Sequence, residues 1–292
     1  MTSKPLVWLI TGCSSGFGRR LAKSALSRGD LVIATARTVD NIQIPKSPNL
    51  RTLQLDLTAG FDAIKLKVNE AAAMWGRIDV LCNNAGLGLP GLLEEGGSSR
   101  LHTQFQTNVY GTFDVTTATI PHMRAQNQGT IVIIGSRSAY KTELPAYGFY
   151  CASKAAVHTP LNLLQGLGET FATELAPAGI KVLIVIPGSF RTENIYGQPF
   201  DMSNPIPGND AMRAKAEKSF TSVAGTEKGD PDKAMEVVVD VVKGEGKASG
   251  REWPLYLALG EDSERDIRAK VGKLVRHVDE WGDVIRSVKF DE

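Results

Sequence analysis

The sequence contains few of the residues that build disulfides and metal centres. Its 292 residues include only three cysteines, Cys13, Cys82 and Cys151, which are widely spaced and form no CxxC pair. The four histidines show no metal-ligand spacing. An odd number of isolated cysteines argues against a disulfide scaffold or a zinc site and favours a reducing compartment. We therefore expect a cytoplasmic protein without a metal.

An excess of one charge and a long apolar run are also missing. The chain has 33 basic and 32 acidic residues, a balance that indicates neither a nucleic-acid partner nor an anionic membrane surface. Its longest apolar run, "IKVLIVIPG", contains a lysine and is shorter than the roughly 18 residues of a membrane helix. The N-terminal "MTSKPLVWLITG" has a short apolar part and no small-residue cleavage site, so we interpret it as a first buried strand and not a signal peptide.

Short β-rich apolar runs alternate with amphipathic stretches of helix length. Nearly continuous apolar runs are typical of strands that are buried on both faces of a parallel sheet. This β-α-β-α order predicts an α/β fold with a doubly wound (Rossmann) parallel sheet and helices on both faces. The predicted strands are 6–11, 31–36, 51–56, 80–85, 130–135, 181–187 and 254–260.

The predicted organisation is a single domain over residues 1–292. We expect a cofactor half (about 1–135), a catalytic and substrate half (about 136–260) and a C-terminal helical extension (about 261–292). Residues 189–232 are rich in Gly, Pro, Asn, Asp and Ser, and we interpret 193–225 as a lid that orders on binding. Asp230 as N-cap and Pro231 at the first helical position predict a helix after it. A charged helix is expected at about 263–275.

The glycine-rich turn "TGCSSGFG" (11–18) follows the first strand and opens the first helix. Gly12 would permit a sharp turn, Gly16 the close approach of a phosphate, and Gly18 close helix–strand packing. A helix N-terminus supplies free N–H groups and a positive dipole for a pyrophosphate. The spacing differs from G-x-G-x-x-G, and many strand-to-helix turns need glycine for structure alone. The candidate cofactor contacts in the turn are Gly12, Ser14, Ser15, Gly16, Phe17 and Gly18.

The second strand ends at Ala36, and Arg37 follows it. In dinucleotide-binding folds an acidic residue near this point binds the ribose 2′-hydroxyl, whereas a basic one suits a 2′-phosphate. Although an exposed arginine after a strand is common, the absence of an acid here favours NADP(H) over NAD(H).

Further motifs resemble the short-chain dehydrogenase/reductase family. The resemblance covers residues 6 to about 192, and the C-terminal part is similar to that of steroid- and retinol-dehydrogenase-like carbonyl reductases. Its ordered motifs are TGxxxGxG (11–18), Asp56, "NNAG" (83–86), Asn108, Gly135-Ser136, the YxxxK of "YCASK" (150–154), and Pro187-Gly188 with Thr192.

The resemblance implies catalytic roles that the chemistry supports. Tyr150 would be the general acid/base, and a free phenol titrates near ~10, too high for efficient proton exchange at pH 7. Lys154, one helical turn on, would lower that pKa and hold the nicotinamide ribose. Ser136 would donate a hydrogen bond to the substrate oxygen, and Asn108 would hold a water. The family serine usually precedes the tyrosine by about thirteen residues; Ser136 stands fourteen and Ser138 twelve before it, so both stay candidates.

The resemblance also implies cofactor contacts after the other strands. Asp56 and Leu57 would meet the adenine ring, and the NNAG residues would lie against the ribose. The residues after the sixth strand would cover the nicotinamide. Each also has an ordinary structural interpretation as a turn or packing residue. These candidates are Asp56, Leu57, Asn83, Ala85, Gly86, Tyr150, Lys154, Pro187, Gly188, Phe190 and Thr192.

We therefore expect an NADP(H)-dependent oxidoreductase that interconverts a hydrophobic ketone or aldehyde and its alcohol by hydride transfer. Two alternatives stand beside it: a non-redox biosynthetic step on the same fold, and a nucleotide-binding protein. A homodimer or homotetramer is implied by the resemblance, through the helices that precede and contain the YxxxK motif, and a long helix at about 152–176 fits this. The predicted substrate wall is apolar and aromatic. It comprises Leu87, Leu89, Leu92, Tyr140, Leu144, Tyr147, Phe190, Ile195, Tyr196, Phe200 and Met202.

Overall fold

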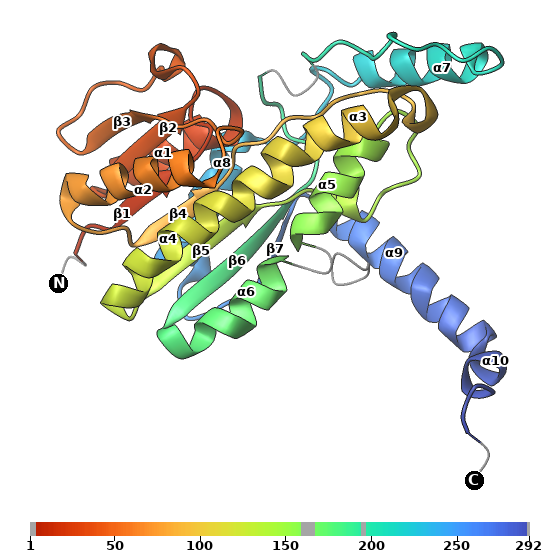
Figure 1. The fold of residues 1–292 in the computed structure, drawn as a ribbon. Helices are drawn as coiled ribbons and strands as arrows, with labels where there is room; N and C mark the ends of the chain where they lie inside the picture. Colours follow the sequence, from red (N-terminus) through yellow and green to blue (C-terminus); the bar gives the residue numbers. More distant parts are fainter. Residues whose placement is uncertain (1–3, 159–166, 194–196, 291–292) are drawn as a thin grey trace.

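The computed structural model describes residues 4–158, 167–193 and 197–290 (Figure 1). Seven parallel strands form one sheet in the order β3-β2-β1-β4-β5-β6-β7. The chain winds outward from β1 to β3 and then from β4 to β7 on the other side, so the predicted doubly wound sheet is confirmed. Such a reversal between β1 and β4 creates a crevice at the carboxyl ends of these strands. The strands are β1 Val7–Ile10, β2 Leu31–Ala36, β3 Leu50–Gln54, β4 Val80–Asn83, β5 Gly129–Ile134, β6 Ile180–Pro187 and β7 Tyr256–Leu259.

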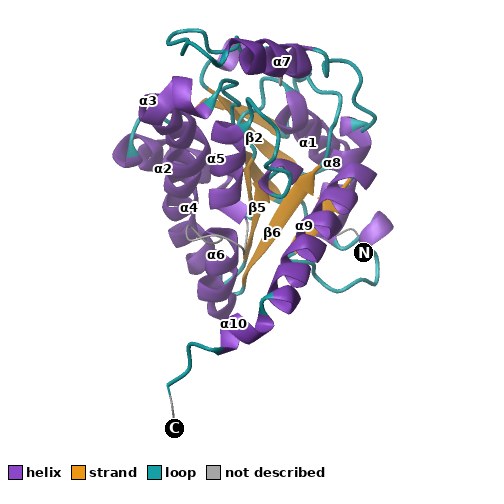
Figure 2. Ribbon diagram, turned by 90° about the vertical axis from the view of Figure 1, so that its right-hand side faces the viewer, coloured by secondary structure: helices purple, strands orange, loops and turns teal. Residues whose placement is uncertain are grey.

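Helices cover both faces of the sheet (Figure 2). On one face α1 and α8 pack Leu21 and Met235 against Trp8 and Ile10 of β1. On the other face lie α2, α4, α5 and α6, which bury a second apolar layer. The helices are α1 Gly16–Ser27, α2 Phe61–Trp75, α3 Leu93–Phe105, α4 Thr112–Gln126, α5 Gly148–His158, α6 Leu167–Leu175, α7 Asp210–Thr221, α8 Pro231–Lys243, α9 Glu261–Glu280 and α10 Gly282–Arg286.

The start of α8 follows the predicted capping pattern. Asp230 accepts hydrogen bonds from the backbone N–H groups of Asp232 (2.9 Å) and Lys233 (3.2 Å), and Pro231 occupies the first helical position. This cap satisfies two N–H groups that the helix itself leaves without a partner.

Several predicted boundaries differ from the structure. No helix was predicted within the proposed lid 193–225, but the structure contains α7 there, which packs Ala216 and Phe220 inward. The predicted helix 152–176 corresponds to α5 and α6, and residues 159–166 between them lie outside the described residues. So do residues 194–196 of the predicted lid. The C-terminal helix is longer than the predicted 263–275, since α9 extends from Glu261 to Glu280. Three acidic residues in its first turn favour the helix start through the helix dipole.

None of the helices described in the structure combines the length and the apolar character needed to span a lipid bilayer.

Candidate active site

The predicted site residues gather where parallel strands end. The glycine turn follows β1, the NNAG motif follows β4, Ser136 follows β5 and Pro187-Gly188 closes β6. Because these strands are neighbours and run in the same direction, their carboxyl ends meet at one edge of the sheet. This edge is where doubly wound folds bind their ligands.

The glycine turn packs directly on the NNAG motif. Gly12 has a φ of 71°, and a Cβ built there would lie 2.8 Å from the Cα of Ala85, so only glycine fits. Asn84 Nδ2 donates to the carbonyl oxygens of Thr11 (2.8 Å) and Gly12 (3.1 Å). Thr11 Oγ1 in turn accepts from the N–H groups of Asn84 (3.0 Å) and Ala85 (2.9 Å). Thr11 and Asn84 thus hold the turn in place. The NNAG motif, which contains Asn84, was the sequence pattern that could have indicated this role.

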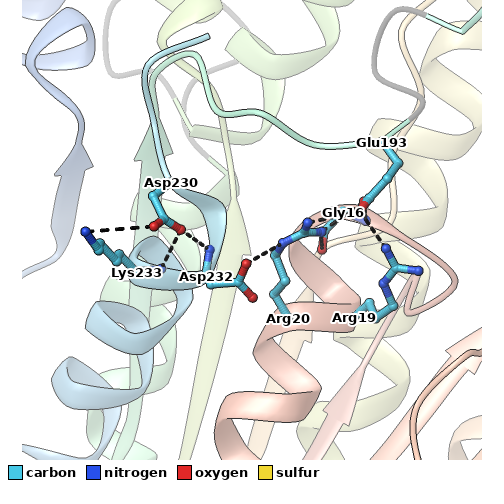
Figure 3. Close-up of polar contacts among 7 residues, drawn as sticks. All are labelled: Gly16, Arg19, Arg20, Glu193, Asp230, Asp232 and Lys233. Carbon is cyan, nitrogen blue, oxygen red and sulfur yellow. Dashed lines mark hydrogen bonds and ion pairs between the residues drawn. The ribbon is translucent and has the colours of Figure 1, made fainter. Parts of the chain in front are cut away.

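A carboxylate is bound at the start of α1 (Figure 3). Glu193 Oε2 accepts a hydrogen bond from the Gly16 backbone N–H over 3.0 Å, and Glu193 Oε1 lies 2.6 Å from Arg19 Nη2. Arg20 contacts both Glu193 oxygens at 2.9 Å and Asp232 at 3.2 Å. The hydrogen bond from Arg20 lowers the pKa of Glu193 far below its usual range. Glu193 was not predicted from the sequence. It lies more than 170 residues after its partners Gly16 and Arg20, and no local pattern marks it.

The segment after β6 also lies on the glycine turn. Phe190 makes an edge-to-face contact with Phe17, with ring centroids 5.3 Å apart. A Cβ at Gly16 would lie 4.0 Å from the Cβ of Thr192. The Gly188 N–H donates to the Leu259 carbonyl oxygen over 2.8 Å, which ties this segment to β7. Phe17, Phe190 and Thr192 therefore lie close together. This is the arrangement expected of residues that contact the same ligand.

Ser136, Tyr150 and Lys154 form a second group, at the end of β5 and the start of α5. The Tyr150 hydroxyl shares a side-chain hydrogen bond with Ser136. Lys154 is 6% exposed; its Nζ donates to the Ile134 carbonyl oxygen over 2.8 Å and lies 5.8 Å from the Tyr150 ring centroid. Ser138 contributes its backbone N–H, which donates to Ser136 Oγ over 3.1 Å. Of the two candidate serines, Ser136 is the one whose hydroxyl meets Tyr150.

Burial dominates the titration of this group. It raises the pKa of Tyr150 to about 12, against the lowering effect of the hydrogen bond with Ser136. It also lowers the pKa of Lys154 to about 8, because an ammonium loses its hydration when buried. The expected lowering of the Tyr150 pKa is thus wrong for this structure. Desolvation of the phenol outweighs the stabilisation of its anion by Ser136, and the Lys154 ammonium is bonded to a β5 carbonyl.

Asn108 lies in a π-helical turn, Gln106–Gly111, between α3 and α4. Its side chain is 2% exposed; Oδ1 accepts from the Leu87 N–H (2.9 Å), and Nδ2 donates to the Leu87 carbonyl oxygen (2.8 Å) and to Ser153 Oγ (3.0 Å). A Cβ at Gly86 would meet Asn108 Oδ1 at 3.3 Å and Lys154 Nζ at 3.6 Å. Asn108 therefore connects the segment after β4 to α5. Such π-helical turns are frequent at functional sites.

Of the remaining predicted contacts, three contact neighbouring protein groups and one is exposed. Asn83 Nδ2 donates to Thr116 Oγ1 over 2.8 Å, so this side chain faces α4 and not the glycine turn. Asp56 Oδ1 accepts from the backbone N–H (2.9 Å) and the hydroxyl (2.8 Å) of Thr58, which closes a turn after β3. Leu57 is buried against Gly111. The side chain of Arg37, by contrast, is exposed at the end of β2.

The predicted substrate wall is partly assembled beneath α7. Tyr147 and Phe200 pack on a small apolar cluster of Leu92, Ala146 and Ala216, and the rings of Tyr147 and Phe220 are 5.5 Å apart. A buried ion pair between Arg213 of α7 and Glu95 of α3, 2.5 Å apart, fixes α7 over this cluster. Leu144 and Met202 are exposed, and Ile195 and Tyr196 lie outside the described residues.

Two similar proteins of named activity are a reductase and a dehydrogenase. The chain is 36% identical to 3-ketodihydrosphingosine reductase of Bacteroides thetaiotaomicron over 190 residues, 65% of both chains. It is 35% identical to human 17-beta-hydroxysteroid dehydrogenase type 1 over 211 residues, 66% of this chain and 60% of that one. The matched region thus spans less than two thirds of the length of each of these two relatives.

The fold is shared with solved structures. A short-chain dehydrogenase from Streptomyces avermitilis superposes with a TM-score of 0.83 at 32% identity, and the match covers 98% of this chain and 100% of that one. The structure of ElxO with NADP bound has a TM-score of 0.66 at 25% identity, covering 87% and 97%. The family model described as short chain dehydrogenase matches residues 6–198. The protein belongs to the short chain dehydrogenase family and is an oxidoreductase of that family.

Proposed function

We propose that the protein is an NADP(H)-dependent oxidoreductase that interconverts a hydrophobic ketone or aldehyde and its alcohol. The observation that carries the proposal is the hydrogen-bonded pair of Ser136 and Tyr150 beside the buried ammonium of Lys154. The reduction of a carbonyl group uses a proton donor beside the hydride donor, and a second hydroxyl and a cation nearby stabilise the negative charge that develops. The glycine turn ends at the same edge of the sheet.

The residues at the glycine turn fit a dinucleotide. The Gly16 N–H and the two arginines of α1 already bind a carboxylate, that of Glu193, so this helix N-terminus accepts an anion (Figure 3). Gly12 leaves no room for a side chain against Ala85. We expect Gly12, Gly16 and Gly18 to border the pyrophosphate, Leu57 and Asp56 the adenine, and Phe190 and Thr192 the nicotinamide end.

Bound NADPH supplies the hydride. Tyr150 donates its hydroxyl proton to the carbonyl oxygen as negative charge develops there, and Ser136 donates a second hydrogen bond to the same oxygen. Lys154 stabilises the phenolate that remains, because a cation nearby favours the charged form of tyrosine. Asn108 positions the Gly86–Leu87 segment next to Lys154. In the direction of oxidation, Tyr150 accepts the proton of the alcohol.

The preference for NADP(H) follows from the end of β2. Ala36 offers no carboxylate for a ribose 2′-hydroxyl, and Arg37 next to it is exposed and available to a 2′-phosphate. These observations support NADP(H) as the cofactor.

The substrate is proposed to be lipophilic. The wall that can be placed, Leu92, Tyr147 and Phe200 under α7, is apolar and aromatic. The two relatives are named as acting on 3-ketodihydrosphingosine and on a 17-beta-hydroxysteroid. A hydrophobic pocket with one polar group at its end suits a ketone or secondary alcohol on an extended apolar body.

A substrate panel with deuterium-labelled NADPH tests this function. The purified chain is incubated with NADPH deuterated at the nicotinamide C4 and with ketones and aldehydes of increasing apolar size. Deuterium at the carbinol carbon of the product is the expected result. Binding of NADPH without transfer to any carbonyl on the panel would contradict the reductase function.

A further inference from the structure

Several donor groups at the start of α1 converge on one carboxylate, that of Glu193 (Figure 3). Arg20 makes a forked contact, from Nη1 to Oε2 and from Nη2 to Oε1, each over 2.9 Å. The Gly16 N–H donates to Oε2 over 3.0 Å, and Arg19 Nη2 donates to Oε1 over 2.6 Å. A helix N-terminus and a forked arginine contact are two arrangements with which proteins bind phosphate groups. The start of α1 is thus suited to an anion, and it binds one that belongs to the chain itself.

The backbone just before Glu193 is held in place, whereas its side chain is open to water. The Ser189 N–H donates to Asp262 Oδ2 over 2.8 Å, and the Arg191 N–H donates to the Gly229 carbonyl oxygen over 3.1 Å. The Glu193 side chain is 40% exposed. Ion pairs that water reaches to this extent contribute modestly to stability. The carboxylate can therefore leave α1 without a movement of the preceding backbone.

The Glu193 carboxylate occupies the donor that the proposed pyrophosphate position needs. Gly16 is the glycine expected to let a phosphate approach the backbone, and its N–H is bonded to Glu193. Among the described residues, the atom nearest to a Cβ built at Gly16 is the Cβ of Thr192, 4.0 Å away. The space beside Gly16 is thus not filled by a packed side chain. Because a carboxylate and a pyrophosphate carry charge of the same sign, they cannot share this N–H.

We infer that Glu193 competes with the cofactor: its carboxylate and the pyrophosphate of the dinucleotide bind the start of α1 in alternation, so Glu193 sets the affinity for the dinucleotide. The inference rests on the proposed function. Affinity falls by the fraction of molecules in which the donors are available. A tenfold loss of affinity therefore corresponds to donors that are bound to Glu193 for about nine tenths of the time.

The guanidinium of Arg20 keeps its place when the carboxylate leaves. Its Nη1 also donates to the Gly16 carbonyl oxygen over 3.1 Å, and its Nε lies 3.2 Å from Asp232 Oδ2 on α8. Figure 3 shows Arg20 between Asp232 and Glu193. Among the described residues, Arg19 instead forms an ion pair with Glu193 alone. Displacement of Glu193 thus leaves one arginine oriented at the glycine turn and frees the other, and both can bind phosphate oxygens.

Glu193→Gln tests this inference by binding and not by turnover. The amide keeps the size of the side chain but carries no charge, so it competes less well for the N–H and the arginines. Calorimetric titration is expected to give about tenfold tighter binding of NADPH, the effect of losing one partly exposed charge-assisted contact. The same gain is expected for NADH, because both nucleotides contain the pyrophosphate. Adenosine 2′-monophosphate, which lacks a pyrophosphate, should bind equally to wild type and variant.

Glu236→Gln is the matched control at the other end of α1. Glu236 is a 50% exposed carboxylate of α8 that pairs with Arg28, the residue after the last turn of α1. The same substitution thus removes the same charge and a similar arginine contact, but about 18 Å from the glycine turn. Charges at this separation are largely screened by salt, so NADPH binding should change less than about twofold. Circular dichroism confirms that all three proteins are folded.

The outcomes separate the inference from the function on which it rests. Equal dissociation constants of NADPH for wild type and Glu193→Gln overturn the inference and leave the proposed function standing. An equal gain in Glu236→Gln, or an equal gain with adenosine 2′-monophosphate, also overturns it, since either would show a general effect of net charge. Absence of NADPH and NADH binding to all three proteins would overturn the proposed function, and the inference with it.

Discussion

The ammonium of Lys154 lies 5.8 Å from the centroid of the Tyr150 ring and donates a hydrogen bond to the Ile134 carbonyl oxygen over 2.8 Å. The strand that precedes Ser136, β5, thus also holds the cation beside the proposed proton donor. Burial in this position lowers the pKa of Lys154 to about 8. The charge of Lys154 therefore lowers the stability of the fold. The lowered pKa and the lost stability can each be measured.

The rate of carbonyl reduction is expected to fall as pH rises through about 8. The reaction needs Tyr150 protonated and Lys154 charged; Tyr150, with a pKa of about 12, keeps its proton throughout this range, whereas Lys154 loses its charge. The pH dependence of kcat/KM for a ketone checks this. A profile that stays flat from pH 7 to about 9.5 would contradict the role of the lysine charge.

Replacement of Lys154 by methionine is expected to stabilise the fold while it abolishes activity. Between pH 8 and 10.5 the unfolded chain binds the proton that the folded chain has released, so stability rises with pH there, and below pH 8 the full cost of the buried charge is present. Lys154→Met should raise the free energy of unfolding at pH 7 by about 1 to 2 kcal/mol, after loss of the bond to Ile134. Urea unfolding at pH 7 measures this. A lower stability would show that the ammonium is not strained by burial.

The two candidate serines are separated by single substitutions. Ser136→Ala removes the hydroxyl that meets Tyr150 and should lower kcat about 100-fold or more. Ser138 contributes its backbone N–H, which Ser138→Ala retains, so turnover should change less than about threefold. Steady-state kinetics with one ketone and saturating NADPH compares the two. The reverse ranking would assign the reaction to Ser138.

Cofactor choice is expected to depend on Arg37. Arg37→Ala should weaken NADPH binding about tenfold and leave NADH binding unchanged, because only NADPH has a 2′-phosphate. Arg51→Ala is the matched control, since Arg51 is an exposed arginine of β3 that stacks on Trp75. Isothermal titration with both nucleotides gives the answer. An equal loss for both would mean that Arg37 does not read the phosphate.

A buried ion pair far from the site is expected to support the sheet. Asp30 is fully buried and accepts hydrogen bonds from Trp8 Nε1 (3.0 Å) and Lys243 Nζ (2.9 Å). Lys243→Met leaves the carboxylate without its cation and should cost about 3 kcal/mol in urea unfolding. Lys233→Met, which removes an exposed pair with Asp230, should cost less than about 0.5 kcal/mol. Similar losses in both would contradict a special role for the buried pair.

The sequence predicted the seven strands of a doubly wound sheet and the grouping of Tyr150 with Lys154 because both depend on local patterns. Continuous apolar runs marked all seven strands, and the i, i+4 spacing of Tyr150 and Lys154 placed them on one side of α5. Glu193 escaped detection, because its partners Gly16, Arg19 and Arg20 are adjacent to it only in the folded chain. The pKa of Tyr150 was misjudged for a similar reason, since desolvation depends on everything that packs around the hydroxyl.

The helix α7 was missed because its stabilising contacts are also long-range. Its sequence has little apolar periodicity, and it is fixed by the ion pair of Arg213 with Glu95 on α3. The length of α9 was underestimated. The apolar residues after 275 are exposed, so burial against the rest of the chain could not indicate how far the helix extends.

Tyr150→Phe tests the central claim most directly. This substitution removes one oxygen atom from the proposed acid and leaves the ring that packs beside Gly88. The measurement pairs the dissociation constant for NADPH with the single-turnover rate of carbonyl reduction. We expect the dissociation constant to stay within about threefold and the rate to fall by about 100-fold to 10,000-fold, as for loss of a general acid. A rate close to that of the wild type would contradict the assignment of Tyr150 as the proton donor.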